Sequence, residues 1–371
     1  MSVAADPAGA GLSLRDLPPN LFAVVMATGI VSAAAHGDGL FAVAYGLFWL
    51  NVGLYPVLWA LLLTHVLRRP GLVLADLRDH ARAPGFFAVV AGTCIVGAQA
   101  VTLGGAVVVG RVLGAAGLLL WFGLTYVLLP TLMEKRIKPS LEHGVNGGWL
   151  LAVVSTQAVC ALGCVIADGA PAEARELLLF TALCFWLLGG MLYGWLIALI
   201  FYRCLFLPLP PRELTPAYWI NMGAMAISTL AGVALVHEAD RLALLAELLP
   251  FLKGVTLLFW ATATWWIPML LALGAWKHLR RRLPFTFAHG YWAAVFPMGM
   301  YTACTQALAG EFHLSFLEVI PHGFIWVALA AWAATFAGLV FHLAGRAAVT
   351  LRARPSRRNN RNLGEPSEPR P

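Results

Sequence analysis

Ten long apolar stretches follow one another between Pro18 and Arg346, with short polar gaps between them. A helix of about 20 apolar residues crosses a bilayer, so each stretch predicts one transmembrane helix. The predicted spans are residues 18–36, 40–66, 84–104, 106–130, 147–167, 174–201, 216–236, 254–275, 290–309 and 314–343. We therefore expect an all-α integral membrane protein with an N-terminal segment (1–17), a ten-helix transmembrane domain (18–345) and a tail (346–371).

The basic residues are concentrated in every second gap. The N-terminus, the gaps after the even-numbered spans and the tail hold 21 of the 25 Lys and Arg residues. Only Arg111, Arg175, Arg241 and Lys253 lie on the other side. Cytoplasmic loops carry such an excess, so both termini are expected in the cytoplasm. The preference for Arg over Lys and the lack of a cleavable or transit sequence favour a bacterial inner membrane.

The composition agrees with this class of protein. The 371 residues are 60% hydrophobic and 12% charged, which does not suit a soluble globule. We attribute the net charge of +7 to topology and expect no nucleic-acid partner. The basic tail is expected to be disordered, with contact to anionic lipid as an alternative. All six cysteines lie within or beside spans, which argues against structural disulfides and metal clusters, and no cofactor is expected.

The odd-numbered spans begin alike. LFAVVMAT at Leu21–Thr28 matches FFAVVAGT at Phe86–Thr93 closely, and WLLAVVST at Trp149–Thr156 matches more weakly. Tyr-Trp pairs open the seventh and ninth spans. Recurrence about every 65 to 75 residues predicts five helical hairpins side by side, and such repeats usually enclose a pathway at their shared axis.

The odd spans also differ from the even spans in polarity. They contain no Asp, Glu, Lys or Arg but many Ser, Thr and Gln residues, whereas the even spans are bulkier and suit an outer ring. A pathway walled by hydroxyl and amide donors without carboxylates favours anions. The alternative is that Ser, Thr and Gly bind helices together. His36 and His289, at span ends, are the candidates for titration near neutral pH, with interfacial packing as the alternative.

Four segments carry a family resemblance: NLFAVVMATGIVS at Asn20–Ser32, NGGWLL at Asn146–Leu151, Ala261–Leu270, and YWAAVFPM at Tyr291–Met298. In this order they resemble the first, fifth, eighth and ninth helices of the tellurite-resistance/dicarboxylate transporter family, which includes fungal malate and sulfite transporters and plant slow-type anion channels. The resemblance implies five hairpins around a central pore, usually in a homotrimer. It also implies transport of a small anion, such as malate, succinate, sulfite, tellurite, a halide or nitrate.

The resemblance further implies that Phe296 closes the pore as a gate. Aligning the repeats places Met26, Ala91, Ser155 and Gly223 at its level, so that one phenyl ring would face four smaller groups. Such a hydrophobic constriction stops hydrated ions. Ala27 departs from the family, where glycine is common, and its methyl group would narrow the pore near Thr28. The expected pore-lining residues are Met26, Ala27, Thr28, Ala91, Thr93, Ser155, Gly223 and Met298.

Two rival functions remain open at this stage. A proton-coupled carrier of C4-dicarboxylates or sulfite normally needs a titratable group on its pathway, and the odd spans offer none, which favours a channel or uniporter. A membrane-embedded enzyme is the remote alternative, because Glu318 and His322 lie four residues apart on the tenth span. The further ligands of a metal enzyme are missing from the pattern, so no catalytic or metal-binding residues are expected.

Overall fold

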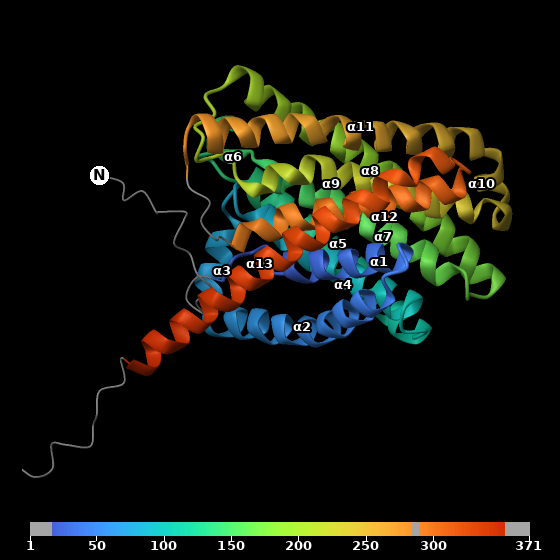
Figure 1. The fold of residues 1–371 in the computed structure, drawn as a ribbon, viewed down its shortest axis with the longest axis horizontal. Coiled ribbons are helices and arrows are strands. Elements are labelled where there is room, and N and C mark those ends of the chain that lie inside the picture. The colour runs from blue at the N-terminus through green and yellow to red at the C-terminus, as the bar shows by residue number, and fades with distance from the viewer. Residues whose placement is uncertain (1–16, 284–288, 353–371) are drawn as a thin grey trace, which may run out of the picture.

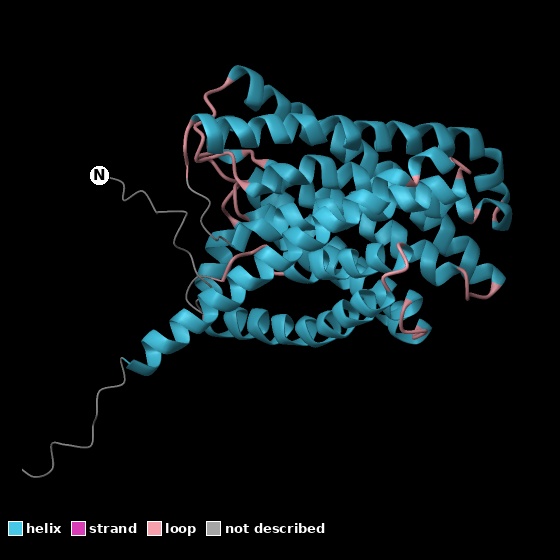
Figure 2. Ribbon diagram, in the orientation of Figure 1, coloured by secondary structure: helices cyan, strands magenta, loops and turns pink. Residues whose placement is uncertain are grey.

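The computed structural model describes residues 17–283 and 289–352, and these residues form helices, turns and loops without a strand (Figure 2). Residues 1–16 of the predicted N-terminal segment and 353–371 of the predicted tail lie outside the described residues. Helix α13 continues to Arg352, past the predicted start of the tail at residue 346. The sequence RAAVTLR at this end contains no helix breaker.

Five helices form an inner ring, and they correspond to the odd-numbered spans. Each packs against two others, in the order α1, α4, α7, α9, α12 and back to α1. Between 72% and 83% of the apolar window is buried in the spans that contain α4, α7 and α9. Their freedom from charged residues allows this burial. The inner helices are α1 (Ala23–Gly37), α4 (Phe87–Thr102), α7 (Leu151–Ala167), α9 (Ile220–His237) and α12 (Trp292–Glu311).

Five longer helices surround this ring, as the bulk of the even-numbered spans led us to expect. Each packs against the inner helix that precedes it in the chain. Only 17% to 33% of their apolar windows is buried, so they present apolar side chains outward. The outer helices are α2 (Phe41–Arg68), α5 (Val107–Met133), α8 (Ala172–Phe206), α11 (Leu249–Ala275) and α13 (Val319–Arg352).

Eight helical segments of the described residues are long and apolar enough to cross a membrane: the five outer helices and those containing α4, α7 and α9. The first predicted span contains α1, a shorter apolar helix of 15 residues. This helix begins at Ala23 because residues 19–22, the first of which is Pro19, form a turn. The ninth predicted span contains α12, whose 20 residues include Pro297.

Short 3₁₀ turns precede the other four inner helices. They are η1 (Ala83–Phe86), η2 (Gly147–Leu150), η3 (Pro216–Trp219) and η6 (His289–Tyr291), and they contact one another in this order. Pro84 and Pro216 suit such first turns, where a missing N–H costs little. The inner helices therefore begin later than the apolar pattern suggested.

The remaining short elements lie at the two ends of the bundle. Figure 1 shows α3 (Pro70–Leu77) and α6 (Leu141–Gly144) at one end and α10 (Ala243–Glu247) at the other. Two 3₁₀ turns, η4 (Ala239–Arg241) and η7 (Ser315–Leu317), connect neighbouring helices. Helix α11 ends in a π-helical turn, η5 (Trp276–Arg280).

Candidate functional site

A cavity of about 670 Å³ lies among the inner helices, and all five contribute to its wall. At one end it reaches the exposed side chains of Asp168 and His237, at the C-terminal ends of α7 and α9. Its wall is mostly apolar along the helices. The wall residues nearest the helix N-termini are Gly29, Ile30, Cys94, Ile95, Ala158, Ile227 and Met300.

The predicted gate layer lies one helical turn beyond the end of the cavity that is nearest the N-termini of the inner helices. Met26, Ala91, Ser155, Gly223 and Phe296 each precede a wall residue by three or four positions, so each shares its face of the helix. All five are buried and none lines the cavity. The cavity therefore ends directly before this layer.

The contacts of α12 indicate where Phe296 points. Gly223 of α9 approaches Pro297 so closely that a Cβ atom on it would lie 2.7 Å from the proline Cγ. A Cβ atom on Gly299 would lie 2.8 Å from Cγ2 of Val31 on α1. Positions 297 and 299 thus face the two neighbouring inner helices. Phe296, four residues before the wall residue Met300, is on the remaining face toward the axis and is 1% exposed.

Aromatic side chains of the outer helices donate hydrogen bonds to the inner helices. Each of the helices α2, α5, α8 and α11 donates at least one hydrogen bond to the next inner helix in chain order, and α13 donates back to α1. Two predicted pore-lining residues, Thr28 and Thr93, are among the acceptors, which agrees with the alternative that hydroxyl groups join helices. Five of these bonds, one from an aromatic side chain of each outer helix, are Tyr55 Oη to Thr93 Oγ1 (3.0 Å), Trp121 Nε1 to Thr156 Oγ1 (2.8 Å), Trp186 Nε1 to the Ser228 carbonyl (2.9 Å), Trp260 Nε1 to Thr305 Oγ1 (3.0 Å) and Trp332 Nε1 to Thr28 Oγ1 (3.0 Å).

The other predicted site residues lie away from the cavity wall. Ala27 is fully buried, and Met298 is partly buried. The ring of His36 packs against the ring of Phe41 on α2, with centroids 5.2 Å apart. His289 is buried in η6, and its ring nitrogens have no hydrogen-bond partner among the described residues. The structure therefore does not bring the two histidines together with the cavity.

Charged residues at the rim of the cavity were missing from the predicted site. Arg241 forms ion pairs with Asp168 and, at 3.5 Å between Nε and Oε2, with Glu238. His237 Nδ1 lies 3.0 Å from Oε2 of Glu311. These acidic residues line the outer part of the cavity. They were missed because they lie just beyond the predicted ends of the odd spans; the charges in those gaps were the available signal.

Glu238 differs from the other rim carboxylates in its burial, since its side chain is only 5% exposed. Burial raises the pKa of the Glu238 carboxyl above its ordinary value, because it disfavours the charged form. Arg241 opposes this shift, Asp168 reinforces it, and His237 and Arg175 oppose it less strongly. Glu238 therefore takes up a proton at a higher pH than an exposed glutamate does.

The two residues behind the enzyme alternative do not form a site together. His322 Nδ1 lies 2.5 Å from Oδ1 of Asp38, on the loop between α1 and α2, and Glu318 is exposed. Across the described ranges, 17–283 and 289–352, no group of three His, Cys, Asp or Glu residues could hold a metal ion.

An inner ring of buried helices around a cavity, enclosed by apolar outer helices, defines a multi-pass membrane protein of the channel or transporter class. The chain belongs to the voltage-dependent anion channel family, which it matches over residues 16–340. This confirms the resemblance inferred from the four segments.

Several curated proteins are similar to this chain. An uncharacterized transporter of Methanocaldococcus jannaschii is 27% identical over 87% of this chain and 92% of its own length. A sulfite efflux pump of Trichophyton rubrum is 24% identical over 89% of this chain and 92% of its own length. An uncharacterized membrane protein of Mycobacterium tuberculosis is 41% identical over 40% of this chain and 74% of its own length. The family and the named transporters point to transport of anions rather than to an enzyme.

Proposed function

We propose that this protein conducts a small anion across the cell membrane along the axis of the inner helices, with Phe296 as the gate. The observation that carries the proposal is the cavity, which is walled by all five inner helices and ends one turn before the Phe296 layer. A phenyl ring on the axis excludes hydrated ions until the side chain moves. In this proposal all ten helices cross the membrane as five hairpins.

The wall chemistry supports an anion as the substrate. The inner helices carry no charged residue before their rim, and at the rim Arg241 and His237 pair with the carboxylates. The name of the Trichophyton rubrum relative favours sulfite. Malate, succinate, tellurite and halides belong to the same class of substrate. The proposed pore lining keeps the predicted set: Met26, Ala27, Thr28, Ala91, Thr93, Ser155, Gly223 and Met298.

The decisive experiment measures reversal potentials of the purified protein in a planar bilayer under a salt gradient. We expect values that follow the anion gradient, and replacement of chloride by sulfite or malate should rank the substrates. A potential that follows the sodium or potassium gradient would exclude an anion pathway.

We also propose that both termini face the cytoplasm of a bacterial cell, because 21 of the 25 basic residues would then lie on that side. Reporter domains fused after Leu67 and after Pro371 should both give a cytoplasmic signal. A fusion in the gap after Thr102 is the control and should read periplasmic. A periplasmic signal from either of the first two sites would contradict ten crossings.

A homotrimer is part of the proposal. The outer helices bury little of their apolar windows within one chain, so they have surface for both lipid and neighbouring subunits. Chemical cross-linking of the protein in native membranes should stop at three subunits.

Proton-linked transport is the second candidate, and the position of Glu238 favours it. This buried carboxyl group is on the cavity wall and is more readily protonated than an exposed one. Its protonation removes a negative charge from the wall and frees Arg241 from one of its two carboxylate partners. Anion flux should therefore increase as the pH at the rim falls.

A glutamine variant tests this role. For the wild type we expect flux to rise severalfold as the outer pH falls far enough to protonate Glu238, which happens at a higher pH than for an exposed glutamate because burial raises the pKa of this carboxyl. Glu238→Gln should show the higher flux throughout and lose most of the pH dependence. The matched control, Glu247→Gln at an exposed position at the end of α10, should retain it. An unchanged pH profile in Glu238→Gln would remove Glu238 from the mechanism.

A further inference from the structure

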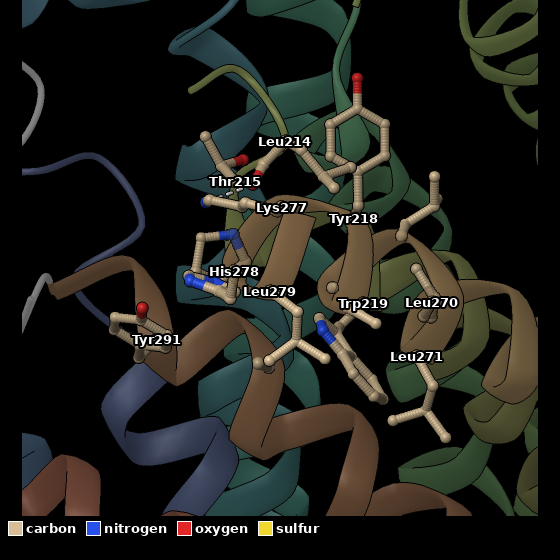
Figure 3. Close-up of a pocket in the computed structure, with 15 residues that line it drawn as sticks. Leu214, Thr215, Tyr218, Trp219, Leu270, Leu271, Lys277, His278, Leu279 and Tyr291 are labelled. Carbon is tan, nitrogen blue, oxygen red and sulfur yellow. Dashed lines mark hydrogen bonds between the residues drawn. The ribbon is translucent and has the colours of Figure 1, made fainter. Parts of the chain in front are cut away.

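A second cavity, of about 370 Å³, lies outside the inner ring, between η3, the end of α11 and the start of α12 (Figure 3). One side of it is apolar. Leu270 and Leu271 lie together there, with Trp219 and Leu279 between them and the polar side. Leu271 is 58% exposed and Leu279 77%, so this wall continues onto the outer surface of the helix bundle.

The opposite side of this cavity is polar. Lys277, His278 and Tyr291 lie there, away from Leu270 and Leu271 (Figure 3). The Lys277 ammonium group donates one hydrogen bond of 2.8 Å to the carbonyl oxygen of Leu214. Within the described residues no carboxylate pairs with this half-buried cation. An ammonium group has three N–H donors, so Lys277 can bind an anion in addition.

The backbone next to Lys277 is unusual. Helix α11 changes to a π-helical turn over Trp276–Arg280, and such turns are frequent at functional sites. Both Lys277 and His278 within this turn line the cavity. Three further arginines follow, and Arg281 lies over the Trp276 ring at 5.5 Å. Lys277 is therefore the cation that lines the cavity, and the chain directly after it is basic.

We propose that this cavity binds an anionic phospholipid of the cytoplasmic leaflet. Its phosphate group contacts Lys277 and Tyr291, and an acyl chain lies along Leu270, Leu271 and Leu279. Charge complementarity selects the anionic headgroup, and the exposed leucine wall selects a ligand with a hydrocarbon chain over free phosphate. The placement in the leaflet rests on the orientation proposed above; the binding itself does not depend on which solute is transported.

Native mass spectrometry of the delipidated protein tests this site. Phosphatidylglycerol and phosphatidylcholine with the same acyl chains are added in turn to the wild type, Lys277→Gln and Lys253→Gln. Lys253 is the matched control, because it lies on the same helix near the other end, over the ring of Phe312. We expect preferential binding of phosphatidylglycerol, weakened about fivefold by Lys277→Gln, as fits the loss of one basic contact. Lys253→Gln should bind like the wild type.

Three results would overturn the proposal. Lys277→Gln could bind phosphatidylglycerol as well as Lys253→Gln does. Inorganic phosphate in millimolar excess could displace the lipid, which would indicate a site for a free anion. The isolated trimer could bind no lipid while the monomer does, which would show a second copy covering the cavity. Flux measured on the same preparations separates a failure of this site from a failure of the proposed transport.

Discussion

Replacing Phe296 by alanine is expected to raise anion flux by about tenfold or more, since lowering a barrier by ~1.4 kcal/mol gives a factor of ten. The side chain is on the axial face of α12, one turn beyond the closed end of the cavity. Its layer partners include Ala91 and Gly223, which are too small to close the space left by the ring. The measurement is anion efflux from liposomes per reconstituted molecule.

Phe87→Ala is the matched control for this variant. Phe87 is a buried phenylalanine of an inner helix, 3% exposed, and outside the predicted gate layer. Its truncation should lower stability by about 3 to 5 kcal/mol without raising flux. If Phe296→Ala instead lowers the amount of folded protein and flux together, Phe296 is a packing residue and the gate lies elsewhere.

The apolar pattern predicted the helices and their division into two rings. Charged residues are too costly to bury, so their complete absence from the odd spans marked the helices that are surrounded by others. The bulky side chains of the even spans indicated which helices face outward. Repeat alignment also predicts a layer of Met26, Ala91 and Phe296, because equivalent helices around one axis place equivalent residues at one depth, and this layer stays a prediction.

Contacts between distant residues could not be read from the pattern. Trp332 and Thr28 are 304 positions apart, and their hydrogen bond depends on α13 packing beside α1. The rim pairs have the same origin, since Arg241 meets Asp168 across 73 positions. The donor-rich inner helices suggested a polar pathway, but several of these hydroxyl groups bind outer helices instead.

The cavity wall offers a test of the pathway that does not depend on the gate. Ala98 is a partly buried wall residue, closer to the rim than the Phe296 layer. In a background with Cys94 and Cys164 replaced by alanine, Ala98→Cys should react with a membrane-impermeant, anionic methanethiosulfonate reagent added outside. The attached group fills the cavity, so flux should fall almost to that of empty liposomes. If Ala98→Cys reacts with the reagent but flux does not fall, the pathway lies elsewhere.

A cysteine beyond the gate layer connects this test to Phe296. Ala88 is fully buried on α4, three residues before Ala91 and therefore one turn beyond the layer. In the same background, Ala88→Cys should be unreactive toward the external reagent, because the closed layer separates it from the cavity. In the double variant with Phe296→Ala, Ala88→Cys should react with the reagent, and this reaction should block flux. Reaction of Ala88→Cys while Phe296 is intact would show that the axis is open at this level and that Phe296 does not close it.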